Sequence, residues 1–297
     1  MLSRVMSRTI AIVGAGRVGT ALARQLRALG WRIGAVVTRS PATSRVAVRK
    51  IGAGRPLVRL SPRVLAADVI LLATPDAALK AVAAELARMG GPACRGKIVL
   101  HASGALGSEV LAPLARRGAA TGSLHPMQTF SGHGTPQLAS VVFAVEGHPK
   151  ALRLAQTMAR SLGGTPVAIA GSAKPAYHAA GVLVAGHALA LVEAAVQTLM
   201  RIGFSRRRAL ETLLPLVRQM LDNFERLGPR PAWTGPVARG DYATMARHVR
   251  ALRRYPPEFR QAYVALALLG GRLLSKRPAE ALDRLQRALK NPGGGSF

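Results

Sequence analysis

The chain has 297 residues, of which 49% are hydrophobic and only 4% aromatic, so an aliphatic core is possible and global disorder is excluded. The 42 Lys and Arg residues, against 13 Asp and Glu residues, give a formal net charge of +29. The single cysteine, Cys94, excludes an intrachain disulfide and a zinc site built from several thiolates. We therefore expect a cytoplasmic protein of about two domains.

The positive charge is spread evenly along the chain, with the densest run at Arg206–Arg208. Two interpretations stay open: an Arg-rich composition with solvated faces, or a partner rich in phosphate. Nucleic-acid binding is the less favoured, because no aromatic residues cluster with the arginines to stack on bases.

Short apolar runs alternate with helical patterns over the first 170 residues, which is typical of a mostly parallel sheet with crossover helices. Strands are predicted at 9–13, 31–38, 68–73, 97–101, 119–124, 141–145 and 166–169. Helices are predicted at 20–29, 76–89, 109–117 and 149–162.

After residue 170 the sequence predicts only helices, at 175–202, 205–227, 241–253 and 257–274. The apolar stretch 181–200 contains His187 and Glu193, so we expect a buried core helix and no membrane span. The N-terminus lacks the features of a signal peptide. The predicted domains are 6–170 and 171–297, with a frayed tail at 276–297.

A glycine-rich motif follows the first predicted strand and opens a helix. It comprises Gly14, Ala15, Gly16, Arg17, Val18 and Gly19. Gly14 permits a tight turn, Gly16 lets the backbone approach a pyrophosphate, and Gly19 allows the helix to pack closely on the sheet. Because the helix N-terminus also presents free N–H groups to an anion, the motif predicts dinucleotide binding.

The second predicted strand lacks the acidic residue that would bind the ribose of NAD. It ends in Thr38, Arg39 and Ser40, and no carboxylate occurs between the motif and Asp68. A guanidinium offers a planar fork to phosphate oxygens, so we expect Arg39 to favour NADP(H) over NAD(H). The alternative is that Arg39 reflects the Arg-rich composition alone.

Ligands of doubly wound sheets lie beyond the carboxyl ends of the strands. We expect Thr74, Pro75 and His101 to line the cofactor there, and Ser103 and His125 to orient a substrate. No metal site is expected, because few carboxylates lie nearby and no His pair has a spacing of four residues.

Lys174 and His178 are four residues apart and lie on one face of a predicted helix. Either can supply a proton to a carbonyl or imine that receives hydride, so Lys174, His178, His125 and Ser103 form the candidate catalytic set. The alternatives are a solvated Lys174 and a core histidine at His178. Arg239 is a candidate for binding a substrate carboxylate.

The motifs GAGRVG, ATPD, HASGAL, GSLHPMQTF, KPAYHAAG and TGPVARGD occur in this order. They resemble a bacterial family of unknown function, with a Rossmann-like domain followed by a helical domain, over about residues 8 to 275. More distantly the chain is similar to pyrroline-carboxylate reductase, ketopantoate reductase, deazaflavin-dependent NADP reductases and the 6-phosphogluconate and β-hydroxyacid dehydrogenases.

The resemblance implies an all-α C-terminal domain of the 6-phosphogluconate dehydrogenase-like kind, which forms a homodimer. β-Hydroxyacid dehydrogenases carry a Lys-x-x-x-Asn pair; Lys174 matches the lysine, and His178 stands at the asparagine position. Members of the bacterial family usually have Asn where this chain has Gly186, followed by His187.

The sequence thus predicts a NADP-dependent oxidoreductase that transfers hydride to or from a small carbonyl or imine compound in an interdomain cleft. A non-catalytic NADP-binding sensor is the first alternative. A basic protein that binds nucleic acid or another polyanion is the second.

Overall fold

The structure is a computed structural model that describes residues 8–134 and 136–290. The chain divides into two compact units, residues 1–187 and 188–297. This division falls inside a long helical stretch, whereas the sequence predicts a boundary at residue 170. Each unit is described by itself below.

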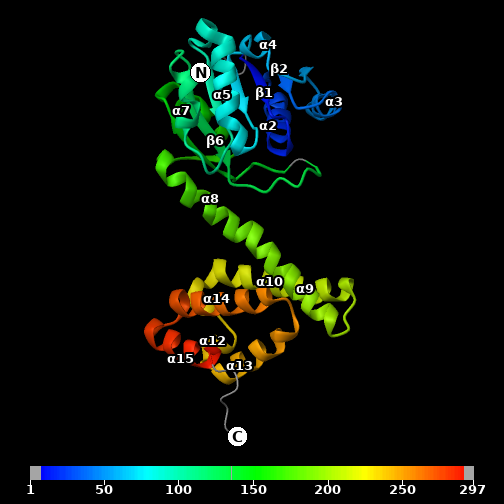
Figure 1. Ribbon diagram of the computed structural model, residues 1–297, viewed down its shortest axis with the longest axis vertical. Helices are drawn as coiled ribbons and strands as arrows, with labels where there is room; N and C mark the ends of the chain where they lie inside the picture. The colour runs from blue at the N-terminus through cyan, green and yellow to red at the C-terminus, as the bar shows by residue number, and fades with distance from the viewer. Residues whose placement is uncertain (1–7, 135, 291–297) are drawn as a thin grey trace. The chain divides into compact units, whose positions relative to one another are not determined.

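The first unit is built on one eight-stranded sheet of order β3-β2-β1-β4-β5-β6-β7-β8 (Figure 1). Its strands are β1 (Thr9–Val13), β2 (Arg32–Val37), β3 (Arg55–Leu57), β4 (Val69–Leu72), β5 (Ile98–His101), β6 (Ala120–Pro126), β7 (Val142–Gly147) and β8 (Thr165–Ala168). All neighbours pair in parallel except β6 and β7. This confirms the predicted Rossmann-type, mostly parallel sheet.

Helices cover both faces of the sheet because its central strands are apolar on both sides. One core cluster joins the sheet to α2 (Arg17–Ala28), α3 (Pro41–Ile51) and α7 (Pro149–Ser161). The other joins it to α4 (Pro62–Leu65), α5 (Asp76–Gly90) and α6 (Ala112–Ala115). The parallel strands therefore end together at one edge, with helices on either side of it.

The sequence did not predict α3 and β3. Ser40 caps α3 by accepting from the Thr43 N–H at 3.2 Å, and Pro41 occupies the first helical position. These are helix-start signals, but a run of Ser, Pro, Ala and Thr resembles a loop. The predicted helix 109–117 is wrong in extent: it is a 3₁₀ turn, Ser108–Leu111, followed by the single turn of α6.

A continuous helical stretch leads from the first unit into the second. It comprises the 3₁₀ turn Gly171–Ala173, α8 (Lys174–Val182), a π-helical turn (Leu183–His187) and α9 (Ala188–Arg201). The prediction of a buried core helix is wrong, because Leu183, Val184 and Leu189 are 60%, 78% and 69% exposed. By length and composition alone this stretch is also apolar enough to cross a membrane.

The second unit is entirely helical over its described residues, as predicted. Its further helices are α10 (Arg206–Leu227), α11 (Pro229–Ala232), α12 (Pro236–Arg239), α13 (Tyr242–Ala251), α14 (Pro257–Leu274) and α15 (Pro278–Lys290). The prediction of a frayed tail is wrong over residues 278–290, where α15 buries Ala281 and Leu285. Leu285 packs beside Gly271 of α14. Residues 291–297 lie outside the described residues.

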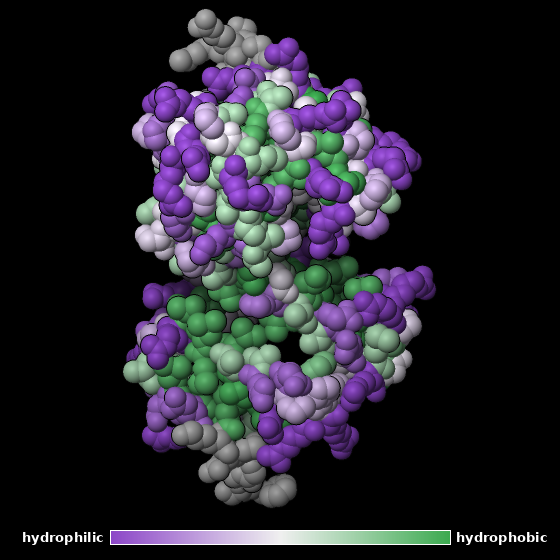
Figure 2. Space-filling view, turned by 45° about the horizontal axis from the view of Figure 1, so that its top comes forward, coloured by the Kyte–Doolittle hydropathy of each residue, from purple (hydrophilic) through white to green (hydrophobic). Residues whose placement is uncertain are grey.

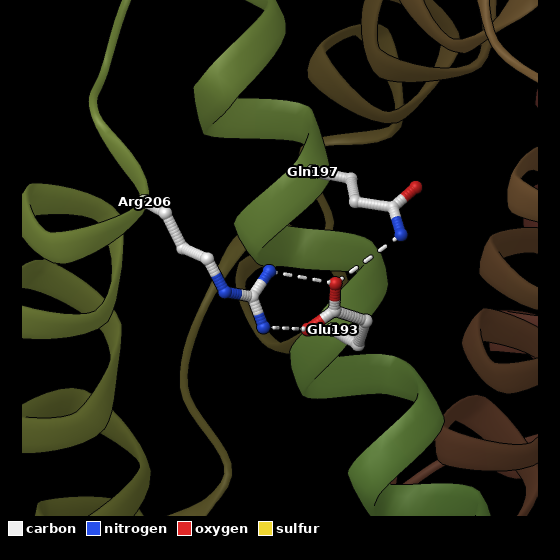
Figure 3. Close-up of polar contacts among 3 residues, drawn as sticks. All are labelled: Glu193, Gln197 and Arg206. Carbon is white, nitrogen blue, oxygen red and sulfur yellow. Dashed lines mark hydrogen bonds and ion pairs between the residues drawn. The ribbon is translucent and has the colours of Figure 1, made fainter.

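Glu193 of α9 is held by side chains on both sides (Figure 3). The Arg206 guanidinium donates to its two carboxylate oxygens at 2.9 and 2.8 Å, and Gln197 donates to one of them at 3.2 Å. These hydrogen bonds lower the pKa of Glu193 to about 2. The polar residue in the apolar stretch therefore ties α9 to the start of α10.

Candidate functional site

The glycine-rich turn has the shape that a dinucleotide pyrophosphate requires. Gly14 has a φ of +88°, and a Cβ atom there would lie 2.6 Å from the Thr74 backbone nitrogen. A Cβ atom on Gly19 would lie 2.7 Å from the Gly14 carbonyl oxygen. A Cβ atom on Gly16 would have nothing within 4 Å, so open space lies over the turn at this residue.

The start of α2 faces this open space without a side-chain cap. Gly16 precedes the helix and makes no capping hydrogen bond, so the first-turn N–H groups keep their capacity to bind an anion. Ala15 is buried, Val18 packs against the core, and Arg17 is exposed at the first helical position. The motif thus combines a positive helix end with room for a phosphate.

Thr74 provides independent support for a ligand at this edge. Thr74 follows β4 in the chain. Its hydroxyl is buried and has no hydrogen-bond partner among the described residues. Pro75 follows as the residue that precedes α5. Because a buried hydroxyl without a partner is costly, Thr74 fits a site that a bound ligand completes.

The end of β2 places Arg39 beside a cluster of hydroxyl groups. The Thr43 hydroxyl lies 2.7 Å from the Thr38 hydroxyl and 2.9 Å from that of Ser40. Arg39 is exposed and has no side-chain hydrogen bond or ion pair with a described residue. Sequence reasoning missed Thr43, which the capping pattern of α3 signals.

His101 is fully buried at the end of β5, and both its ring nitrogens are engaged. The Ser103 N–H donates to Nδ1 at 3.2 Å, so Nε2 carries the hydrogen and donates to the Gly107 carbonyl oxygen at 3.2 Å. Burial, and then the charge of Lys174, lower the pKa of His101 to about 3. In this arrangement His101 is neutral and shapes the turn from 101 to 107.

Lys174 is fully buried at the first residue of α8. Its ammonium group donates to the Ser103 carbonyl oxygen at 2.7 Å and to the Ser123 hydroxyl at 2.8 Å. Burial lowers the pKa of Lys174 to about 8, against the opposing attraction of Glu146, Asp76 and Glu109. The site therefore contains a buried positive charge below about pH 8. Sequence reasoning missed Ser123.

Ser103 stabilises its own turn. Its hydroxyl oxygen accepts from the N–H groups of Ala105 and Leu106 at 3.1 and 3.0 Å, which leaves the hydroxyl hydrogen available to donate. Together with the bond from Lys174 to its carbonyl oxygen, these contacts fix the chain at Gly104.

His125 and His178 converge over Gly104. A Cβ atom on Gly104 would lie 2.6 Å both from Nε2 of His125 and from Nδ1 of His178. The two rings pack edge to face, with centroids 5.8 Å apart. Burial, and then the charge of Lys174, lower the pKa of His125 to about 4, so His125 is neutral at pH 7.

Tyr177 is a member of this cluster that sequence reasoning missed. Its hydroxyl lies 3.2 Å from Nδ1 of His125, and the two rings pack edge to face. Burial raises the pKa of Tyr177, so its hydroxyl stays protonated and can either donate to Nδ1 of the neutral imidazole or accept from it. Because Tyr177 engages Nδ1 of His125, Nε2 is the nitrogen that faces Gly104. The sequence feature that could have identified Tyr177 is its position between Lys174 and His178 in the predicted helix.

Two other sequence motifs lie outside this cluster. Arg239 ends α12 in the second unit, so the first unit does not bring it together with the other candidates, and its role stays a prediction. Gly186 and His187 lie in the π-helical turn, where both are exposed. Among residues 8–134 and 136–290, no group of three His, Cys, Asp or Glu side chains could hold a metal ion.

The loop after β6 covers one side of the glycine-rich turn, which the sequence did not predict (Figure 1). Gln25 of α2 donates to the Pro136 carbonyl oxygen at 3.1 Å. A Cβ atom on Gly132 would lie 3.3 Å from Nε of Arg17. A groove of about 610 Å³ runs between this loop, the turn and α3.

Comparisons with known proteins agree with this architecture. A proposed NADP oxidoreductase from Bacteroides fragilis is 21% identical, with a TM-score of 0.73, over 94% of this chain and 99% of that one. An imine reductase from Streptomyces aurantiacus is 15% identical (TM-score 0.64; 94% and 99% covered). A pyrroline-5-carboxylate reductase from Coxiella burnetii is 15% identical (TM-score 0.55; 95% and 98% covered).

At these identities the likeness shows the fold alone. Comparison of the sequence with curated proteins finds no significant match. Two family models match parts of the chain: residues 3–126 match a Rossmann-like domain, and residues 141–269 match a domain of unknown function (DUF2520). The chain thus combines a Rossmann-like domain with a DUF2520 region, in a fold shared with NADP oxidoreductases.

Proposed function

We propose that the protein is a NADP-dependent oxidoreductase that transfers hydride to or from a small carbonyl or imine compound. The observation that carries this proposal is the open space at Gly16 beside the unpartnered hydroxyl of Thr74, at the strand edge next to the Lys174 and His178 cluster. The fold shared with NADP oxidoreductases and an imine reductase supports it.

The residues at this edge fit the parts of NADP(H). The N–H groups of residues 17–19, at the start of α2, would hold the pyrophosphate, and Thr74 would donate to or accept from the adjacent ribose. Arg39 would bind the 2′-phosphate beside the N-terminus of α3. When bound, the nicotinamide supplies or accepts the hydride.

We assign proton transfer to His178 and a positioning role to Lys174. A catalytic acid must contact the atom that it protonates, and Lys174 has no exposed surface in this structure, whereas His178 is only partly buried. Lys174 instead fixes the Ser103 turn and supplies a positive charge beneath it. His125, held by Tyr177 at Nδ1, presents its Nε2 towards the same place.

The burial of Lys174 also favours a second candidate function, a NADP-binding sensor that turns over no substrate. Such a protein would bind NADPH but would not oxidise it with any member of a broad panel of carbonyl and imine compounds. Oxidation of NADPH that depends on one such compound would exclude the sensor.

The first prediction concerns the coenzyme preference. Replacing Arg39 with Asp is expected to weaken NADPH binding at least 10-fold and to leave NADH binding within about threefold, because one charge-assisted phosphate contact contributes about 1.5–3 kcal/mol. Isothermal titration with both coenzymes measures this. Arg45→Asp, on the exposed surface of α3, is the control for net charge. An unchanged ratio of the two affinities in Arg39→Asp would remove the phosphate argument.

We further propose that the protein is a soluble, cytoplasmic homodimer formed through the second unit. Figure 2 shows hydrophobic residues gathered on this unit, where Leu189, Leu216 and Phe224 are 69%, 66% and 55% exposed. Apolar surface of this extent requires a covering partner. The charged Glu193–Arg206 pair argues against lipid as that partner, because an ion pair is costly to transfer into a bilayer.

The second prediction tests this interface. The double variant Leu216→Asp, Phe224→Asp is expected to be monomeric at concentrations where the wild type is dimeric, because each buried carboxylate would oppose association. Light scattering coupled to size-exclusion chromatography gives the mass directly. Glu225→Gln on the same helix is the matched control and should remain dimeric. A wild-type chain that is monomeric would contradict the proposal.

A further inference from the structure

A second large groove lies at the opposite edge of the sheet, where the parallel strands begin. It has a volume of about 1080 Å³ and passes the residues that precede β1, β4 and β5. One of its walls is α7. Six cationic side chains line it: Arg8, Arg95, Lys97, Lys150, Arg153 and Arg160.

Half of these cations form a stripe along α7. Lys150, Arg153 and Arg160 follow one another at intervals of three and seven residues and therefore lie on one face of the helix. Residues 150–160 span about 15 Å at 1.5 Å per residue. Along the axis of double-stranded DNA each strand carries one charge per 3.4 Å or so, so this length matches about four successive phosphates of one strand.

Within the described part of the chain, the six cations have no side-chain partners. None of them forms an ion pair or a side-chain hydrogen bond with another of the described residues. The single carboxylate in the groove, Asp68, accepts from the Thr9 N–H at 2.8 Å. By contrast, arginines of the second unit do pair with carboxylates, as Arg284 does with Glu280 at 2.7 Å. The groove thus carries six cations against one carboxylate and has a concentrated net positive charge.

We propose that this groove binds a linear chain of phosphate groups through charge alone, as inorganic polyphosphate or as a nucleic-acid backbone. Four of the six cations are arginines, whose guanidinium forks match phosphate oxygens. No aromatic side chain lines the groove, so bases would not be read or stacked. Its apolar residues Leu154 and Ile98 are buried, which leaves no exposed apolar side chain to hold an acidic protein.

This site is separate from the proposed coenzyme site. The groove lies at the amino ends of β1 and β4, whereas Gly14 and Thr74 follow the carboxyl ends of the same strands. Phosphate chains and NADPH should therefore bind at the same time. The Gly16→Val variant should retain its affinity for phosphate chains, so failure of the coenzyme proposal would leave this one standing.

The test uses the full chain with three fluorescent probes: inorganic polyphosphate, a random single-stranded DNA of about 16 nucleotides, and polyglutamate of similar charge. Fluorescence anisotropy is measured from low to high salt, with NADPH present throughout. The groove variant is Lys150→Gln, Arg153→Gln, Arg160→Gln. The matched control, Arg59→Gln, Arg63→Gln, Arg88→Gln, removes three exposed cations elsewhere in the same unit.

We expect the wild type to bind a phosphate probe. A plot of the logarithm of the binding constant against the logarithm of the salt concentration should have a slope of about −4, since six contacts contribute about −0.7 each. The groove variant should bind at least 10-fold more weakly, with a slope smaller by about two, and the control within threefold of the wild type. The tighter of the polyphosphate and DNA probes identifies the source of the phosphates. Equal losses in both variants, absence of binding at low salt, or tighter binding of polyglutamate would overturn the proposal.

Discussion

Replacing Lys174 with Met is expected to lower kcat about 100-fold, the size of effect found when one preorganised electrostatic group is removed from an active site. The substitution removes the buried positive charge and the hydrogen bonds to Ser103 and Ser123 but keeps an unbranched side chain that is one atom shorter. NADPH affinity should stay within about threefold, because the glycine-rich turn is untouched. Steady-state rates with a carbonyl or imine compound that the wild type reduces, together with NADPH titration, measure both.

The pH profile separates the charge of Lys174 from its geometry. Because its pKa is about 8, the ammonium is charged below that pH and loses its charge as the pH rises through it. A neutral amine can still donate to Ser103 and Ser123, so only the charge disappears. The wild-type rate should therefore fall above about pH 8, and Lys174→Met should lack this fall.

Two further variants make the assignment falsifiable. His178→Asn should lose 10²- to 10⁴-fold in kcat as a lost proton-transfer group while retaining the fall above pH 8. Ser123→Ala removes one acceptor of the ammonium and should move the fall to lower pH, because the charged form loses a hydrogen bond. If the rate of Lys174→Met also fell near pH 8, a group other than Lys174 would be responsible for the fall.

Gly16→Val is expected to weaken NADPH binding at least 100-fold with little change in stability. A Cβ atom at this position would have no protein atom within 4 Å, and the side chain would occupy the space proposed for the pyrophosphate. The backbone of Gly16 is extended, with φ −77° and ψ −151°, and it does not have the positive φ that strains an L side chain. Calorimetric titration measures the affinity, and thermal unfolding measures the stability.

Gly14→Ala is the matched comparison within the same motif. At Gly14 we expect the substitution to lower the stability of the fold. Its φ of +88° and the 2.6 Å approach to the Thr74 nitrogen make any side chain strained and overlapping. We expect a loss of about 2–4 kcal/mol in the free energy of unfolding. If Gly16→Val were as unstable as Gly14→Ala, or bound NADPH normally, the proposed division of roles within the turn would be wrong.

Local sequence patterns predicted most of the sheet because its strands are short, apolar and bounded by Gly or polar residues. The pattern failed where tertiary contacts decide the structure. β3 has three residues and contains Pro56, so it carries no periodic signal and forms only by pairing with β2. The long helix at 174–201 was placed correctly, but the prediction that it is buried was wrong. Hydropathy does not show which partner covers an apolar face.

The residues of the candidate site that lie at strand ends or helix starts could be predicted from the sequence. Lys174, His125 and His178 follow from those rules, and the structure brings them together in the first unit. The sequence could not show that Lys174 is buried or that Tyr177 bonds to His125, because both depend on how α8 packs on β6 and β7. The basic groove was equally hidden: Arg8, Arg95 and Arg160 are distant in sequence and are gathered only by folding.

The coenzyme site is the centre of this account, and calorimetric titration of the purified wild-type chain with NADPH and NADH tests it most directly. We predict saturable heat with NADPH at micromolar to submillimolar concentrations and weaker binding of NADH. Absence of heat with either coenzyme at millimolar concentrations would contradict the account and leave only the fold.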